Sequence, residues 1–107
     1  MATVRPTQLF PGYTSDGTNV TIPLASLPKL TAANANAATG NGIDFIWAVL
    51  DAAIENINGL AVEARPTKAT LTKANPVVVP GGNGAISQAY TFNPQLMPTG
   101  YDLVDEP

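Results

Sequence analysis

The strongest pattern along the chain lies between residues 43 and 58, where apolar side chains recur with the period of an α-helix. Asp44, Asp51, Glu55 and Asn58 fall on the opposite side of this pattern. We therefore expect one amphipathic helix whose polar face, including the Asp51 and Glu55 carboxylates, is solvated. The apolar stripe consists of Ile43, Ile46, Trp47, Leu50, Ala53, Ile54 and Ile57, widened on one flank by Phe45 and Val49.

Both ends of this helix carry recognisable signals. Asn41 is a suitable N-cap, and Asp44 stands in the first turn, where the helix dipole favours an anion. Gly59 can end the helix in a left-handed conformation. The preceding Gly40-Asn41-Gly42 segment lacks a phosphate-binding pattern, so we interpret it as a helix-entry loop.

Two further segments carry the sequence signals of β-hairpins. Asp16-Gly17 stands between β-forming residues and predicts a short hairpin, since the tight turn needs the positive φ that Gly adopts freely. Residues 77–79 and 86–92 flank the glycine-rich segment 81–84 and predict a second hairpin.

The two ends of the chain are rich in Pro and poor in periodic pattern. Pro6 and Pro11 favour an extended conformation, so we expect an extended N-terminal arm over residues 1–11. We expect another extended tail over residues 94–107. The predicted fold is α+β: one central helix packed on short antiparallel hairpins in a small domain spanning residues 12–93.

The composition changes this picture because it leaves few large apolar side chains to form a core. Hydrophobic residues make up 45% of the chain, but many are Ala, and only 12% of residues are charged, against roughly a quarter in typical domains. Low charge protects a monomer poorly, so we expect a homo-oligomer or a lattice-bound subunit. The candidate partner-interface residues are Leu9, Phe10, Tyr13, Trp47, Leu96, Met97, Tyr101 and Leu103. Trp47 fits either a core position or an anchor at a subunit contact.

Several classes of function have no support in the residues. The chain has neither Cys nor His, and its five basic residues are too dispersed to neutralise a phosphate backbone, so we expect no nucleic-acid partner. No apolar run approaches the ~20 residues of a membrane span, and the first residues do not form a signal peptide, so we expect no membrane partner. We predict no catalytic residues, no cofactor-binding residues and no metal ligands, hence no enzyme.

Residues 27–40 follow the pattern L-x-x-L-T-A-x-x-A-x-x-x-T-G, the predicted helix comes after them, and the chain ends in the acidic segment "PTGYDLVDEP". In these features the chain resembles small virion structural proteins of tailed bacteriophages, particularly those of cyanobacterial phages. Where such phage proteins often show Gly-Asp before the helix, this chain has Gly40-Asn41. The matching positions are Leu27, Leu30, Thr31, Ala32, Ala35, Thr39 and Gly40.

This resemblance implies a non-catalytic capsid cement or decoration protein, made in the host cytoplasm and bound to the major capsid protein or other virion proteins. A neck or tail component is an alternative. A second alternative is a small adaptor that binds a ligand through its hairpin loops, with residues 81–84 as the tip.

Overall fold

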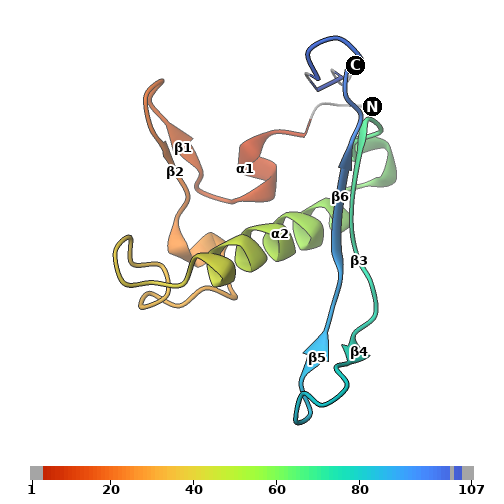
Figure 1. Cartoon of the computed structure of the whole chain (residues 1–107). Helices are drawn as coiled ribbons and strands as arrows, with labels where there is room; N and C mark the ends of the chain where they lie inside the picture. Colours follow the sequence, from red (N-terminus) through yellow and green to blue (C-terminus); the bar gives the residue numbers. More distant parts are fainter. Residues whose placement is uncertain (1–3, 102, 105–107) are drawn as a thin grey trace.

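A computed structural model of the chain describes residues 4–101 and 103–104. Helix α2 runs through the centre, with the N-terminal segments on one side and a long two-stranded ribbon crossing it on another (Figure 1). The elements are α1 (Pro6–Leu9), β1 (Thr14–Ser15), β2 (Val20–Thr21), the 3₁₀ turn η1 (Leu24–Ser26), α2 (Gly42–Asn58), the 3₁₀ turn η2 (Val62–Ala64), β3 (Ala69–Lys73), β4 (Val77–Val78), β5 (Ile86–Ser87) and β6 (Tyr90–Pro94).

The predicted start of α2 is confirmed in detail. The Asn41 side-chain oxygen accepts hydrogen bonds from the backbone N–H groups of Ile43 (2.9 Å) and Asp44 (3.2 Å). Both donors lack a partner within the helix, so the cap satisfies them. The Asp44 carboxylate also accepts a hydrogen bond of 2.6 Å from the side-chain amide of Asn34, which ties the lead-in loop to the first turn.

The predicted end of α2 is wrong in conformation. Gly59 is the C-cap, but its φ of −78° and ψ of −11° are right-handed. Arg65 supplies the missing partners instead: its guanidinium donates to the carbonyl oxygens of Leu60 (3.1 Å) and Asn58 (2.9 Å). A cation at this end also complements the helix dipole.

The extended conformation expected for residues 1–11 is wrong for α1. Pro6 is the first residue of this helical turn, where its fixed φ suits a helix and its missing N–H costs nothing. The Gln8 side chain accepts a hydrogen bond of 2.7 Å from the Arg5 N–H and so closes the turn. Asn56 of α2 donates to the Leu9 carbonyl, which holds α1 against the central helix. Residues 1–3 lie outside the described residues.

The first predicted hairpin is confirmed. Strands β1 and β2 pair antiparallel, with Thr14 opposite Thr21. Asp16 organises the turn by accepting hydrogen bonds from the N–H groups of Thr18 and Asn19, while Gly17 takes a φ of +88°. This is the local side-chain turn chemistry that favours Asp before Gly.

The second predicted hairpin is the outer part of a longer ribbon. Strands β4 and β5 pair as expected, and β3 pairs with β6 further from the turn, so that Lys73 lies opposite Tyr90 and Val77 opposite Ser87. Between the two ladders residues 74–76 face residues 88–89, and this extra residue interrupts the pairing in the manner of a β-bulge. We call residues 69–94 the β-ribbon and its outer part, residues 74–89, the β-arm.

The core lies between α2, α1 and the segment that follows β2. Its buried members include a face of small side chains on α2, among them Ala48 and Ala52. Partly buried Leu9, Tyr13, Ile22, Val49 and Leu71 pack around it. The buried cluster is Phe10, Leu27, Leu30, Ala48, Ala52 and Ala53.

The predicted apolar stripe of α2 is buried along only part of its length. Ala53, Ile54 and Ile57 at the C-terminal end are buried, whereas Ile43 is 74% exposed and Ile46 54% exposed. The expectation that the whole stripe faces the core is therefore wrong for its first two turns. The chain has too few other large side chains to cover them.

The C-terminal tail folds back on itself within the described residues, so the expected extended conformation is wrong there. Leu96 and Leu103 form an antiparallel bridge, and the Val104 N–H donates to the Gln95 carbonyl at 2.9 Å. Positive φ angles at Gly100 (80°) and Tyr101 (57°) turn the chain between them. Residues 102 and 105–107 lie outside the described residues. The α+β class itself is confirmed: the described part of the chain has one main helix and three two-stranded antiparallel sheets.

Replacing the N-cap tests the entry into α2. We expect Asn41→Ala to lower the free energy of unfolding by about 1 kcal/mol, since two backbone N–H groups lose their acceptor. Asn41→Asp keeps an acceptor oxygen and is expected to stay near the parent value. Urea unfolding monitored by circular dichroism measures both, and equal stability of Asn41→Ala and the parent would contradict the capping role.

Candidate functional site

A buried carboxylate joins α2 to the β-ribbon. Asp51 is only 4% exposed, and its carboxylate accepts hydrogen bonds from the Lys73 ammonium (3.0 Å) and the Tyr90 hydroxyl (2.9 Å). Lys73 and Tyr90 are partners in the β3–β6 ladder, so both side chains reach α2 from the same place on the ribbon. The Lys73 ammonium also contacts Glu55 at 2.6 Å, and the Lys29 ammonium lies 4.0 Å from Asp51.

The partners of Asp51 decide its protonation state. Burial by itself raises the pKa of Asp51, but the hydrogen bonds from Lys73 and Tyr90 and the charges of Lys73 and Lys29 outweigh it. The pKa of Asp51 is therefore below its usual value. Hydrogen bonds to Glu55 and then to Asp51 raise the pKa of Lys73 in turn. The contact therefore keeps the Asp51 carboxylate ionised and the Lys73 ammonium protonated.

The expectation of a solvated face at Asp51 and Glu55 is wrong for Asp51. Four residues apart on a helix, the two carboxylates do point the same way, and Lys73 bridges them. Their partners come from β3 and β6, far along the chain, and no local pattern indicates them. A general acid needs a raised pKa, and the pKa of Asp51 moves in the opposite direction. The arrangement suits a structural link better than proton transfer.

The sequence left open whether Trp47 lies in the core or at a subunit contact, and in the structure it has features of both. Its indole N–H donates a hydrogen bond of 2.9 Å to the Tyr90 hydroxyl, which continues the chain of contacts to Asp51. The Lys29 ammonium lies 5.2 Å from the ring centroid, within range of a cation–π contact. The side chain is still 39% exposed. One edge of Trp47 is thus fixed to the ribbon while part of the ring remains accessible.

The structure divides the eight candidate interface residues into two groups. Phe10 is buried in the core, with Leu9 and Tyr13 packed beside it, because α1 lies on α2 instead of extending away. Phe10 is therefore a core residue, while Leu9 and Tyr13 are only partly exposed. Trp47, Leu96, Met97, Tyr101 and Leu103 remain exposed.

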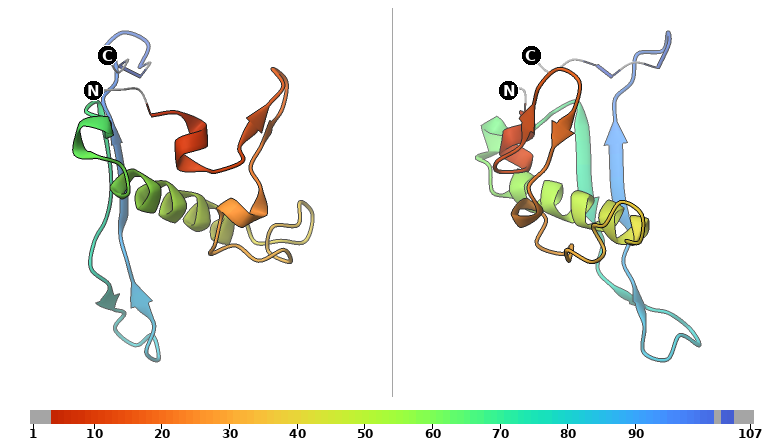
Figure 2. Two further views of the ribbon diagram at one scale, coloured as in Figure 1. Left: turned by 180° about the vertical axis from the view of Figure 1, so that it is seen from behind. Right: turned by 90° about the vertical axis from the view of Figure 1, so that its left-hand side faces the viewer.

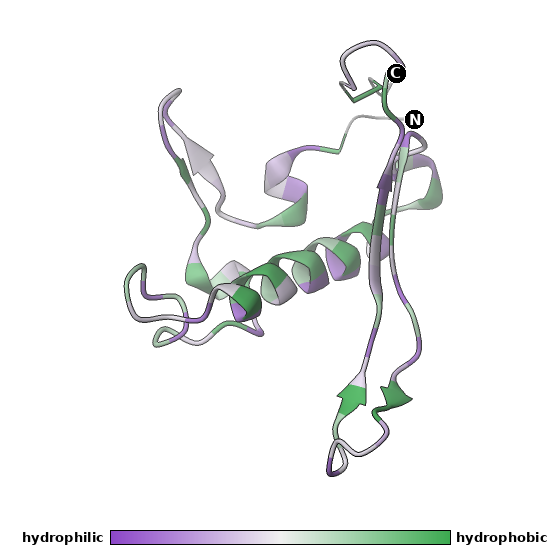
Figure 3. Cartoon of the chain, in the orientation of Figure 1, coloured by the Kyte–Doolittle hydropathy of each residue, from purple (hydrophilic) through white to green (hydrophobic). Residues whose placement is uncertain are grey.

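Further apolar side chains are also exposed. The sequence placed some of them in the core and did not single out the others as contacts. They gather at the start of α2 and on the β-ribbon, where Figure 3 shows the hydrophobic colour on β4, β5 and the first turns of the helix. On α2 they are Ile43, Phe45 and Ile46, and on the ribbon Val77, Val78, Ile86 and Phe92. The sequence indicates the helix and the strands that carry these side chains, but not that no other layer covers them.

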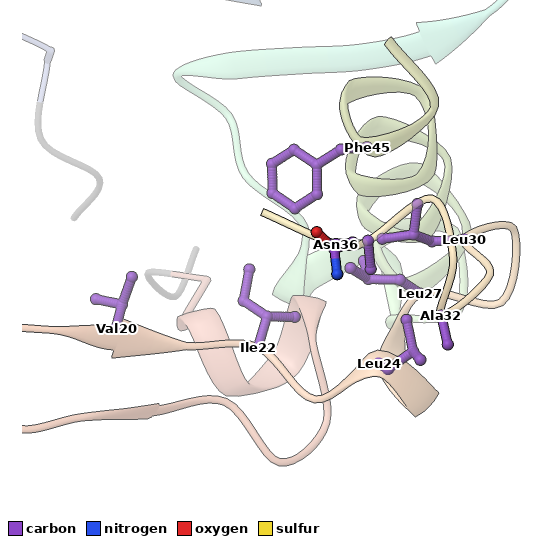
Figure 4. A pocket seen from close by; sticks show the side chains of 9 residues that line it. Val20, Ile22, Leu24, Leu27, Leu30, Ala32, Asn36 and Phe45 are labelled. Atoms are coloured by element: carbon purple, nitrogen blue, oxygen red, sulfur yellow. The ribbon is translucent and has the colours of Figure 1, made fainter. Parts of the chain in front are cut away.

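An open apolar groove lies beside this surface, between the first hairpin and α2. Its volume is about 440 Å³. Figure 4 shows Phe45 above and Ile22 below, with Leu27 and Leu30 to the right of both. No charged side chain lines it. The groove consists of Val20, Ile22, Leu24, Leu27, Leu30, Ala32, Ala35, Asn36 and Phe45.

The molecule is less compact than a self-contained monomer of its size. Its radius of gyration is 16.0 Å, whereas about 13 Å is typical for this length. Its accessible surface is 7480 Å², whereas a folded monomer of its mass exposes about 5,700 Å². The excess of roughly 1,800 Å² is of the order of the total area buried in a standard protein–protein interface. The candidate functional site is the uncovered apolar surface at the start of α2 and on the β-ribbon.

The distribution of charge sets the β-arm apart. Every residue from Ala74 to Tyr101 is uncharged. The β-arm therefore lacks the charged side chains with which proteins usually keep free strand edges from pairing with other chains.

Comparison with protein-family models, with curated proteins and with solved structures gave no match. Among the described residues no helix is long and apolar enough to cross a membrane. The same residues contain no group of three or more acidic side chains placed to hold a metal ion.

Removing the buried charge tests the link between α2 and the β-ribbon. We expect Asp51→Asn to lower the free energy of unfolding by about 2 kcal/mol, since hydrogen bonds to a charged group are lost at a buried position. Glu55→Gln is the matched control, because Glu55 bonds the same ammonium but is exposed, and we expect a loss of roughly 0.5 kcal/mol. Chemical denaturation compares them; equal losses would contradict a special role for Asp51.

The same residue predicts a pH dependence. Because the pKa of Asp51 is lower in the folded chain than its usual 3.8, its contribution is fully present above pH 3.8 and is lost as the pH falls through the folded-state value. The stability difference between the parent and Asp51→Asn should therefore shrink as the pH falls below 3.8. Hydrogen bonds from the Asn19 and Thr18 N–H groups lower the pKa of Asp16, but this effect is common to both proteins and cancels. A difference independent of pH would contradict the assignment.

Proposed function

We propose that this chain is a non-catalytic structural protein of a virion, which cements or decorates the capsid of a tailed bacteriophage through protein–protein contacts. The observation that carries the assembly part is the uncovered apolar surface on an extended molecule. The resemblance of the segment around Leu27 to Gly40 to phage virion proteins supports the virion part. The partners would be the major capsid protein or other virion proteins.

The proposed role follows from the way such a surface contributes to stability. Apolar area buried between chains contributes roughly 25 cal/mol per Å² before the costs of association are subtracted. A subunit that binds only the assembled state shifts the equilibrium toward assembly by mass action. A chain with little core of its own and much apolar surface gains most of its burial from its neighbours. It would be made in the host cytoplasm and act on the capsid surface.

Two alternatives share part of this support. A neck or tail component would present the same kind of surface, but at a single site on the particle. A loop-binding adaptor would use residues 81–84, where Gly81, Asn83 and Gly84 have positive φ and form the far end of the β-arm. Substituting Asn83 by Ala should matter for the adaptor and be tolerated by a decoration protein whose tip stays exposed.

Imaging of labelled particles tests the proposal. We expect an epitope tag on this chain to appear by negative-stain electron microscopy of purified phage particles at many symmetric positions on the capsid. Label confined to one vertex or to the tail would favour the neck or tail alternative. Absence of the chain from purified particles would overturn the virion role.

Substitution of exposed apolar residues tests the surface itself. We expect Ile43→Ser with Ile46→Ser to reduce incorporation into particles by at least about tenfold, since two apolar contacts in an interface centre are lost. The unfolding midpoint should hardly change, because both side chains are exposed. Val62→Ser is the matched control, because Val62 is equally exposed but lies on η2, beyond the other end of α2. Equal effects of the two changes would contradict this assignment of the surface.

A further inference from the structure

We infer that the β-arm of one copy of this chain docks into the apolar groove of the next copy, so that the copies associate head to tail. This inference rests on the assembly role proposed above and names the partner, a second copy of the chain. Three observations carry it: the state of the β-arm, the character of the groove, and the amount of surface that each chain leaves uncovered.

The β-arm is poorly supported by its own chain. It is two strands thick, and a two-stranded ribbon is marginally stable in water without a layer packed on it. Its residues Val77, Val78 and Ile86 are each more than half exposed. Both of its edges carry backbone groups without a neighbouring strand, and no charge protects them. The β-arm therefore needs cover from another chain.

The groove offers cover of matching character. Leu24, Leu27 and Phe45 line it, and it has no charged member that a docking β-arm would have to desolvate. The chain carries a formal net charge of −3, so contacts between copies are most favourable where they bring no carboxylates together. The β-arm and the groove are two such uncharged surfaces.

A chain cannot bring its own β-arm to its own groove. The β-arm leaves α2 at Lys73 and Tyr90 and extends away from the helix, whereas the groove lies between the first hairpin and the start of α2. Figures 1 and 2 both show the tip of the β-arm far from the first hairpin. Beyond Lys73, which contacts Asp51, residues 74–79 rise ~3.3 Å each and carry the β-arm roughly 20 Å away from α2. The β-arm thus reaches well beyond its own body, and the contact must be intermolecular.

The uncovered area favours a head-to-tail contact over a symmetric dimer. In a symmetric dimer each chain buries about 800 Å² in one standard interface. In a head-to-tail array each chain takes part in two interfaces, one through its β-arm and one through its groove, and buries about 1,600 Å². The second value is close to the excess of roughly 1,800 Å² that separates this chain from a compact monomer.

Engineered cysteines test the contact, because the chain has no Cys of its own. The full-length double variant Asn83→Cys with Ala32→Cys places one thiol at the β-arm tip and one at the groove. Under mild oxidation we expect it to form a series of covalent oligomers beyond the dimer on a non-reducing gel. Asn83→Cys with Thr7→Cys is the matched control, with the second thiol on exposed α1 outside the groove, and it should give at least about tenfold less product.

Sedimentation velocity of the unmodified chain gives an independent measurement. We expect oligomers that dissociate on dilution, and at least about tenfold weaker association after Ile86→Asp, which buries a charge in the contact. Val62→Asp is the control with the same chemistry on an exposed site outside both surfaces. Unfolding curves of both variants confirm that the monomer still folds.

Each outcome decides the inference. Covalent oligomers that require both the tip and the groove thiol support it. A monomer at all concentrations without cross-links, efficient cross-linking of Asn83→Cys alone through tip-to-tip pairing, or equal product from the Thr7 control would each overturn it. The virion role fails separately, by absence from particles. The chain could be present on particles and still show no contact between β-arm and groove.

Discussion

The position of the β-ribbon on α2 depends on one buried carboxylate. Asp51 needs compensating partners in order to be buried as an anion, and Lys73 and Tyr90 provide them from paired positions of two strands. This contact fixes which side of α2 faces the ribbon. With that side fixed, the small side chains of Ala48 and Ala52 lie in the core with Phe10. Ile43 and Ile46 are then left facing outward.

The features that sequence reasoning predicted correctly are those decided by immediate neighbours. Asn41 caps α2 because its side chain reaches N–H groups two and three residues ahead, and Asp16 organises its turn in the same way. The length of α2 and the pairing of β4 with β5 also follow from local periodicity. In each case the interaction that decides the structure is contained within a few residues.

The features that sequence reasoning missed depend on distant partners. The burial of Asp51 depends on Lys73 and Tyr90, which lie 22 and 39 residues away. The helical turn at Pro6 is held by Asn56 of α2, so the same Pro that suggested an extended arm begins a helix. The exposed half of the α2 stripe was unpredictable for a further reason. A periodic apolar pattern shows which residues share a face, but not whether the chain has enough bulk to cover it.

The charge-free character of residues 74–101 has a consequence for how the proposed assembly responds to its surroundings. Contacts made by charged side chains weaken as salt screens them, but a contact between uncharged apolar surfaces has no such term. Hydrophobic association instead weakens on cooling, because its driving force near room temperature is almost entirely entropic. A particle held together by the β-arm would therefore keep its contacts at high salt concentration and lose some of their strength at low temperature.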